Sequence, residues 1–180
     1  EDILKIWQNK YKYILIDEFQ DINTLQYKII KLLAMPENNL FIVGDDDQSI
    51  YRFRGANPSI MLNFEKDFTS SKRILLDTNY RCSGRILAGA KKVISHNRER
   101  FDKEIKAFRE EGEPVVVRQF ENLQKEVDSI VDELQNYKVR GIEYSDMAIL
   151  LRTNTQPGLL VQKLMEFNIP FRMKDVMPNI

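Results

Sequence analysis

Two acidic clusters follow two short apolar runs, and their side chains are the ones in the sequence best suited to chemistry. Asp17 and Glu18 directly follow the run at 13–16, and the aspartate triplet 45–47 follows the run at 40–43. Apolar runs of this length are typical of buried strands in parallel sheets, where ligands bind beyond the carboxyl ends of the strands. We therefore expect both clusters at the same edge of one sheet.

The first cluster suits metal-assisted hydrolysis. An ionised aspartate such as Asp17 is a good ligand for Mg²⁺, and an adjacent glutamate such as Glu18 can orient or deprotonate an attacking water. Acidic residues also end many strands without any chemical role, so the pair alone leaves both interpretations open. Gln20 and Asp21, in the same turn, favour the functional interpretation.

The triplet 45–47 also has two interpretations. Three successive carboxylates could bind a metal ion. Like charges so close together are more simply held by backbone amides or by neighbouring bases, and this second interpretation is the one we favour.

Two segments combine aromatic rings with arginine. The segment 51–54, Tyr-Arg-Phe-Arg, could stack nucleobases, hold phosphates or pack against a neighbouring domain. Tyr80 and Arg81 lie at the expected boundary between two α/β units, where a ring and a fixed cation could meet a nucleotide. Taken singly, the segment 51–54 is better explained by packing against a neighbouring domain, and Arg81 is better explained by a surface ion pair.

Strands and helices alternate along the chain, which predicts an α/β fold with parallel sheets and flanking helices. We expect strands at 13–16, 40–43, 74–76, 115–117 and 147–151, and a short terminal strand. We expect helices that start near Ile3, at Asn23 or Thr24, at Pro58, and near Ser83, Leu123 and Leu159.

The composition excludes several classes of protein. The chain has 27 Lys and Arg against 27 Asp and Glu, so any electrostatic recruitment must be local. No apolar run approaches the roughly 20 residues of a membrane helix, so we expect no membrane partner. A single cysteine, Cys82, and a single histidine, His96, exclude an internal disulfide and a His/Cys zinc site, and we expect a cytoplasmic protein.

One stretch of the chain is basic. Residues 81–109 contain nine Lys and Arg against three Asp and Glu. This stretch could track a DNA backbone, or it could be the solvated flank of a helix.

Together, these segments resemble the UvrD/Rep/PcrA-type superfamily 1 DNA helicases. ILIDEFQD is similar to the family's Walker B segment (motif II), VGDDDQSIYRFRGA to motif III and TNYRC to motif IV. AILLRTN at 148–154, with IPFR at 169–172, is similar to a segment of the family's second motor domain. The order and spacing of these segments agree across essentially the whole chain.

The resemblance implies two RecA-like (P-loop NTPase) motor domains that close on Mg²⁺-ATP and step along single-stranded DNA, with 3′–5′ unwinding at duplex junctions. It implies that Asp17 binds Mg²⁺, that Glu18 is the general base toward the water attacking the γ-phosphate, and that Gln48 senses that phosphate. It further implies that Tyr80 stacks on the adenine and that Arg81 reaches the γ-phosphate from the second domain.

The resemblance also implies a DNA contact. Tyr51 and Phe53 match positions where the family stacks DNA bases. Arg54 matches a position where the family makes a coupling contact near the nucleotide. Phe53 stands where many relatives carry Trp, so stacking is retained with less area. Cys82 stands where Ser is common, and we interpret it as a small neighbour of the site.

Some of the family's motifs do not occur in this sequence. There is no G-x-x-x-x-G-K-[ST] phosphate loop, and motifs V and VI are missing. We therefore expect an internal slice of a helicase: 1–77 as the later part of the first motor domain and 78–180 as the early part of the second, ending near Asp175. The isolated chain is expected to be inactive. Two alternatives remain, a non-hydrolysing scaffold that binds DNA or protein and the motor of a helicase-nuclease.

Overall fold

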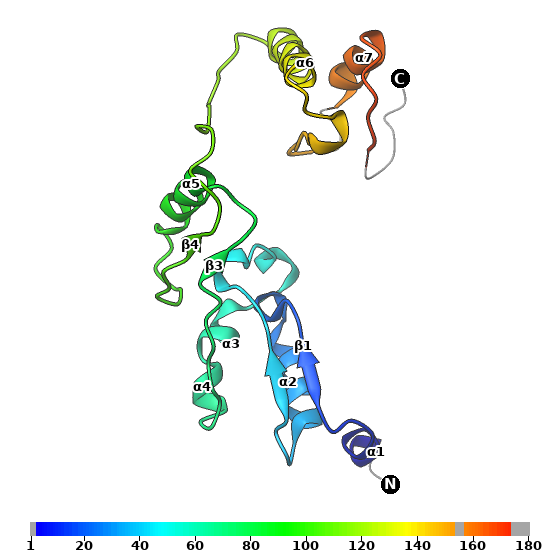
Figure 1. Cartoon of the computed structure of the whole chain (residues 1–180). Coiled ribbons are helices and arrows are strands. Elements are labelled where there is room, and N and C mark those ends of the chain that lie inside the picture. Colours follow the sequence, from blue (N-terminus) through cyan, green and yellow to red (C-terminus); the bar gives the residue numbers. More distant parts are fainter. Residues whose placement is uncertain (1–2, 154–156, 174–180) are drawn as a thin grey trace. The chain divides into compact units, whose positions relative to one another are not determined.

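The computed structural model describes residues 3–153 and 157–173, and the chain divides into two compact units, Glu1–Val115 and Val116–Ile180. We describe each unit by itself. The first contains two small parallel sheets with their helices, and the second is built around two helices, α6 and α7 (Figure 1).

The first unit is organised by a β-α-β arrangement. Strands β1 (Ile14–Ile16) and β2 (Leu40–Ile42) pair in parallel with Leu15 opposite Phe41, and α2 (Thr24–Ala34) connects them. Helix α1 (Ile3–Lys10) precedes β1. These elements confirm the predicted helices and strands in this part of the chain.

A capping box starts α2 at the residue where the sequence predicts it. The Asn23 side chain accepts a hydrogen bond from the Gln26 amide at 2.9 Å, and the Gln26 side chain accepts one from the Asn23 amide at 2.8 Å. This reciprocal pair satisfies two backbone N–H groups that the first helical turn otherwise leaves without partners.

The core of the first unit lies between α2 and the short helices α3 (Pro58–Leu62) and α4 (Phe64–Asp67). Phe19 is fully buried and meets Tyr27 and Phe64 edge-on, with ring centroids 6.0 and 5.6 Å away. The buried members of this core are Phe19, Ile22, Tyr27, Ile30, Ile60 and Phe64. Because Phe19 directly follows the acidic pair, the core fixes the position of that pair.

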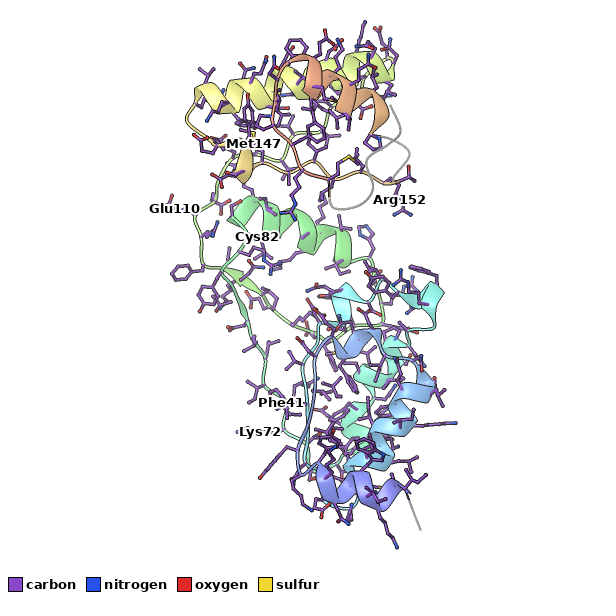
Figure 2. The ribbon with its side chains drawn as sticks, turned by 90° about the vertical axis from the view of Figure 1, so that its right-hand side faces the viewer. Phe41, Lys72, Cys82, Glu110, Met147 and Arg152 are labelled. Atoms are coloured by element: carbon purple, nitrogen blue, oxygen red, sulfur yellow. The ribbon has the colours of Figure 1, made fainter. Side chains whose placement is uncertain are left out.

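The sheet of β1 and β2 leaves part of its apolar surface open. Leu15 and its register partner Phe41 are 69% and 57% exposed. Figure 2 labels Phe41 beside the two strands. Ile16, Leu40 and Ile42 pack against the buried core instead. This alternation is the pattern of a sheet with one covered face.

The second sheet of this unit corrects one prediction. Strand β3 (Thr78–Asn79) pairs in parallel with β4 (Lys106–Ala107), and α5 (Gly84–Ile94) lies between them in sequence. The predicted strand at 74–76 is wrong, because this apolar run is exposed and unpaired, and the ladder forms at 78–79 instead.

The second unit packs α6 (Leu123–Val139) against α7 (Gly158–Glu166), both close to their predicted positions. The Asn122 side chain caps α6 by accepting a hydrogen bond from the Lys125 amide at 3.0 Å. A short helical turn, η4 (Tyr144–Asp146), lies between the two helices in sequence. The buried members of its hydrophobic cluster are Val127, Val131, Leu160, Leu164 and Ile169, and Val161 is also buried.

Two further strand predictions are wrong. Residues 115–117 and 147–151 form no strand ladder. The predicted terminal strand falls in part outside the described residues, and residues 170–173, which are described, form no ladder. Val117 and Leu150 are more than nine-tenths exposed. An apolar run becomes a strand only where a neighbour supplies hydrogen bonds, and no described segment does so here. Asn154 and Asp175, which the sequence analysis used, lie outside the described residues.

The described elements confirm a mixed α/β fold with small parallel sheets. Among the described residues, no helix has the length and apolar character needed to cross a membrane.

Candidate functional site

The two acidic clusters meet at the carboxyl ends of β1 and β2, as the sequence predicts. Beyond the strands, the Val43 amide donates to the Ile16 carbonyl at 2.8 Å, and the Phe19 amide donates to the Val43 carbonyl at 2.9 Å. These two hydrogen bonds extend the pairing of the two segments past the ends of β1 and β2. Asp17 and Glu18 therefore lie beside the loop that carries the triplet 45–47.

Glu18 has a backbone conformation that is unusual for a residue with a side chain. Its φ of 50° and ψ of 42° lie in the left-handed region. The Glu18 amide donates to Asp17 Oδ1 at 2.8 Å, and the Glu18 carbonyl accepts from the Asp21 amide at 3.0 Å. Such a conformation costs about 1 kcal/mol or more and is enriched at functional sites.

Gln20 links the two acidic clusters, and the sequence analysis did not identify it as a site residue. It lies in the short helical turn η1 (Phe19–Asp21) and is 1% exposed. Its Nε2 donates to Glu18 Oε2 at 2.7 Å, and its Oε1 accepts from the Asp45 amide at 3.0 Å. Its carbonyl accepts from Ser49 Oγ at 3.2 Å. The only signal for this role in the sequence is a polar residue between a strand end and a helix.

Gly44 allows this link to form. A Cβ at position 44 would lie 2.6 Å from Gln20 Oε1 and 3.1 Å from the Phe19 nitrogen. Both separations are shorter than ordinary contacts, so the loop after β2 approaches η1 this closely only with glycine at this position.

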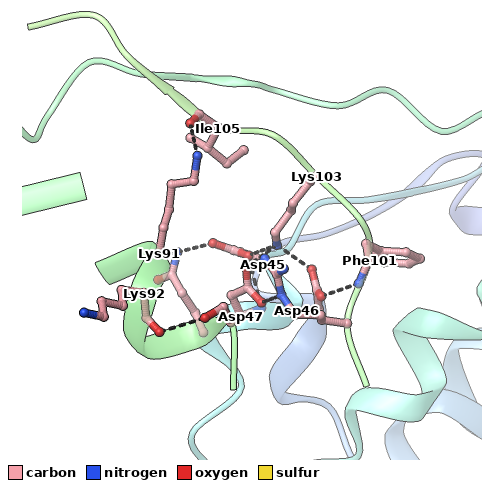
Figure 3. Close-up of polar contacts among 11 residues, drawn as sticks. Asp45, Asp46, Asp47, Lys91, Lys92, Phe101, Lys103 and Ile105 are labelled. Carbon is pink, nitrogen blue, oxygen red and sulfur yellow. Dashed lines mark hydrogen bonds and ion pairs between the residues drawn. The ribbon is translucent and has the colours of Figure 1, made fainter. Parts of the chain in front are cut away.

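The aspartate triplet is neutralised by two basic residues from a distant segment. Lys103 Nζ lies 2.5 Å from Asp45 Oδ1, 2.6 Å from Asp46 Oδ1 and 3.1 Å from Asp47 Oδ2 (Figure 3). Arg100 binds both oxygens of Asp47, with Nε at 2.8 Å and Nη2 at 2.7 Å.

The contacts of the triplet agree with the interpretation that neighbouring bases hold the like charges. The Phe101 amide also donates to Asp46 Oδ2 at 2.8 Å. No group of three or more His, Cys, Asp or Glu side chains in the described part of the chain is arranged to hold a metal ion. The triplet is therefore an ion-pair network.

The contacts of the network shift the pKa values of Lys103, Asp45 and Asp47 toward the charged forms, although these side chains are partly buried. Burial favours the neutral form of Lys103, but its hydrogen bonds to the three carboxylates outweigh that effect and raise its pKa. The Arg100 hydrogen bond lowers the pKa of Asp47. Burial raises the pKa of Asp45, but hydrogen bonds from Lys103 and Gln48 outweigh that effect and lower the pKa below its usual value.

Gln48 belongs to the same network. It ends the short helical turn η2 (Asp46–Gln48) and is exposed. Its Nε2 donates to Asp45 Oδ2 at 2.8 Å, and its amide donates to the Asp45 carbonyl at 2.9 Å. Asp45 and Gln20 therefore connect Gln48 to Glu18, and the structure brings these two predicted residues into one network.

The aromatic and arginine side chains that follow Gln48 form an exposed group. Tyr51 and Phe53 have ring centroids 5.9 Å apart, and the Arg54 guanidinium lies 5.0 and 5.4 Å from the two centroids. Residues 52–54 form the turn η3 (Arg52–Arg54), and Phe53 is 78% exposed. The Phe53 ring is therefore largely open to solvent, and the Tyr51 ring, which is 37% exposed, is partly open.

Tyr80 and Arg81 form a second, separate group. The exposed Tyr80 ring lies 5.1 Å from the Phe108 ring, and the Tyr80 carbonyl accepts from Arg109 Nε at 3.0 Å. The Arg81 amide donates to Asn79 Oδ1 at 3.0 Å. Within the described residues, neither residue makes a hydrogen bond or ion pair to the Glu18–Gln48 network.

The basic stretch 81–109 is partly occupied by contacts within the protein. Four of its nine basic side chains bind other parts of the chain. Lys91 Nζ donates to the Ile105 carbonyl at 3.3 Å, and the other three are Arg100, Lys103 and Arg109. Of these four, Arg100 and Lys103 pair with carboxylates, whereas Lys91 and Arg109 bind backbone carbonyls.

Two families of protein domains match this chain. The UvrD/REP helicase N-terminal domain matches residues 1–69, and the UvrD-like helicase C-terminal domain matches residues 74–178.

Individual relatives match over nearly the whole chain. YjcD from Bacillus subtilis is 42% identical over 171 residues, which cover 94% of this chain and 22% of YjcD. The ATP-dependent DNA helicases PcrA of Staphylococcus epidermidis and Staphylococcus aureus are 41% and 40% identical over 172 residues, which cover 96% of this chain and 24% of each relative. The chain thus spans less than a quarter of the length of these relatives.

Proposed function

Because this chain belongs to the UvrD-like helicase family, we propose that it carries part of the nucleotide and DNA sites of an ATP-dependent DNA helicase. The longer protein that contains it would hydrolyse ATP to translocate 3′–5′ on single-stranded DNA and to open duplex junctions. We propose residues 1–77 as part of a first RecA-like motor domain and residues 78–180 as part of a second. The compact unit 1–115 would then include the beginning of the second domain.

One observation carries this proposal, the hydrogen-bonded path that joins Glu18 to Gln48 through Gln20 and Asp45. A motor must respond to the γ-phosphate at the moment of hydrolysis, so its base and its phosphate sensor have to be held together. This path supplies that connection between residues from two different loops.

The chemistry of Asp17 fits a magnesium ion. Its Oδ1 accepts the Glu18 amide, while its Oδ2 accepts no hydrogen bond from any described residue. A carboxylate oxygen at a strand end is a ligand that Mg²⁺ prefers, and the bound ion would neutralise charge on the phosphate oxygens of ATP.

Glu18 would act as the general base. The Gln20 amide occupies its Oε2, which fixes the plane of the carboxylate and leaves Oε1 to accept a proton from water. Gln48 would contact the γ-phosphate, and its side chain is held ready by Asp45. From the second domain, Tyr80 would stack on the adenine and Arg81 would reach the γ-phosphate.

The exposed group at 51–54 would contact DNA. Stacking of bases on Tyr51 and Phe53 is worth about 1–3 kcal/mol per base and tolerates any sequence, as a translocating motor requires. Arg54, whose guanidinium lies over both rings, would make a contact near the nucleotide that couples the two sites.

The test is ATP hydrolysis by the full-length protein, with and without single-stranded DNA. We expect a DNA-stimulated rate that falls by about two to four orders of magnitude in Glu18→Gln, because general-base catalysis contributes that much. The matched control is Glu37→Gln, the same change at an exposed acid beyond α2. No stimulated rate in the wild type would refute the proposal and favour the scaffold. Equal rates in the wild type and Glu18→Gln would refute the role of Glu18.

A further inference from the structure

The segment that follows α5 reaches back to the loop that carries Gln48. Lys103 and Arg100 stand between 53 and 58 residues from the aspartates that they bind. The Lys103 side chain is only 8% exposed and that of Asp46 only 2%, so the contact between them is shielded from solvent, whereas the Asp45 side chain is 40% exposed. Ion pairs shielded in this way are geometrically demanding, unlike exposed pairs on a surface.

Asp45 is the point at which this contact joins the proposed catalytic groups. Its Oδ1 binds Lys103, and its Oδ2 binds Gln48. Its backbone amide binds Gln20, which binds Glu18. In this hydrogen-bonded path, Asp45 alone lies between Lys103 and Gln48. Asp45 and Gln20 lie between Lys103 and Glu18.

Removing the ammonium group would disturb this arrangement in a defined way. Three adjacent carboxylates would remain, and Arg100 binds only Asp47 among them. Asp45 and Asp46 would repel each other without a shared cation, and a buried charge that loses its partner is costly. The loop would relieve this cost by moving its carboxylates toward water, and Asp45 would then release Gln48.

We propose that Lys103 is a positioning residue for ATP hydrolysis, because its ammonium group holds Asp45 where Asp45 can orient Gln48 and, through Gln20, Glu18. Arg100 supports the same loop through Asp47. This inference rests on the proposed function. Under the proposed division at 77/78, the contact also joins the first motor domain to the second, so the orientation of Gln48 would depend on both.

The experiment measures kcat and KM for ATP at saturating single-stranded DNA in the full-length protein. Lys103→Met keeps the length of the side chain and removes its charge. Asp45→Asn keeps the shape of a partly exposed residue and weakens its hold on Gln48. Lys28→Met is the control, because Lys28 is an exposed lysine on α2 outside the network. Thermal unfolding of each variant is measured in parallel.

We expect kcat to fall by about ten- to hundredfold in both network variants, because small displacements of catalytic groups have effects of this size. KM should change by less than kcat, and Lys28→Met should match the wild type. The double variant Lys103→Met/Asp45→Asn should lose no more than the worse single variant, since both changes break the same link.

Several outcomes would overturn the inference. Wild-type kcat in both network variants would do so, as would a multiplicative loss in the double variant or an equal loss in Lys28→Met. If Lys103→Met does not fold, Asp45→Asn decides alone, and unchanged kcat in that variant then refutes the inference. A wild-type protein without DNA-stimulated hydrolysis would instead refute the proposed function, which is a distinguishable result.

Discussion

Substituting Gly44 by alanine tests whether the close approach at Gln20 holds the site together. The new Cβ would lie 2.6 Å from Gln20 Oε1 and 3.1 and 3.3 Å from the backbone nitrogens of Phe19 and Gln20. A flexible side chain in solvent could move aside easily. Gln20 cannot, because it is buried and its amide is bound at both ends.

The size of the effect follows from what Gln20 must give up. Its hydrogen bonds to Glu18 and to the Asp45 amide contribute about 1 kcal/mol each, and the bond to the charged carboxylate contributes somewhat more. The close contacts of the new Cβ destabilise the folded state further. In the opposite direction, alanine lowers the conformational entropy of the unfolded chain, which stabilises the protein by about 0.4–1 kcal/mol. We expect Gly44→Ala to lower the free energy of unfolding by about 2 kcal/mol.

The assay is denaturant unfolding of the 180-residue chain, followed by the fluorescence of Trp7, its single tryptophan, which lies in the same compact unit as Gly44. Gly89→Ala is the matched control, since nothing lies within 4 Å of a Cβ there and the residue is inside α5. Helix propensity predicts that this control is more stable by up to about 1 kcal/mol. If Gly44→Ala is as stable as Gly89→Ala, the close approach does not exist and the reasoning is wrong.

Two further predictions concern pH and DNA. The lowered pKa values of Asp45 and Asp47 stabilise the fold above the ordinary aspartate pKa of about 4, and this stability is lost as pH falls through the lowered values. The raised pKa of Lys103 stabilises the fold below about pH 10.5, and this contribution is lost as pH rises through the raised value. Burial and the hydrogen bond to Asp67 raise the pKa of Tyr27, which adds to the alkaline decline in the unfolding free energy, so this decline should become smaller in Lys103→Met without disappearing. Phe53→Ala should weaken single-stranded DNA binding by about 1–3 kcal/mol, or roughly 5- to 150-fold, in fluorescence anisotropy titrations of the full-length protein. The more conservative Phe53→Tyr should retain most of the affinity, and equal losses in both variants would argue against stacking.

The parts of the fold that the sequence predicted correctly depend on local signals. The Asn23 capping box, Pro58 in the first turn of α3 and the apolar runs of β1 and β2 each act within a few residues. The meeting of both acidic clusters also follows from a general property of parallel sheets.

The remaining features depend on contacts between distant segments. The run at 74–76 has the apolar character of a strand, but the residues that pair with β4 are Thr78 and Asn79. Lys103 is one of nine bases in its stretch, and nothing local distinguishes it from the others. Gln20 is polar, and only its burial between two loops reveals its role.

Under the proposed role of Glu18 as the general base, its backbone conformation implies a conflict between stability and activity at a single position. Glycine or asparagine adopts a φ of 50° at lower cost than glutamate does. Selection for thermal robustness alone would therefore favour replacing this residue, and the replacement would remove the carboxylate. A laboratory evolution experiment that selects only for folded protein should drift toward glycine or asparagine at position 18, whereas a selection that requires hydrolysis should retain glutamate.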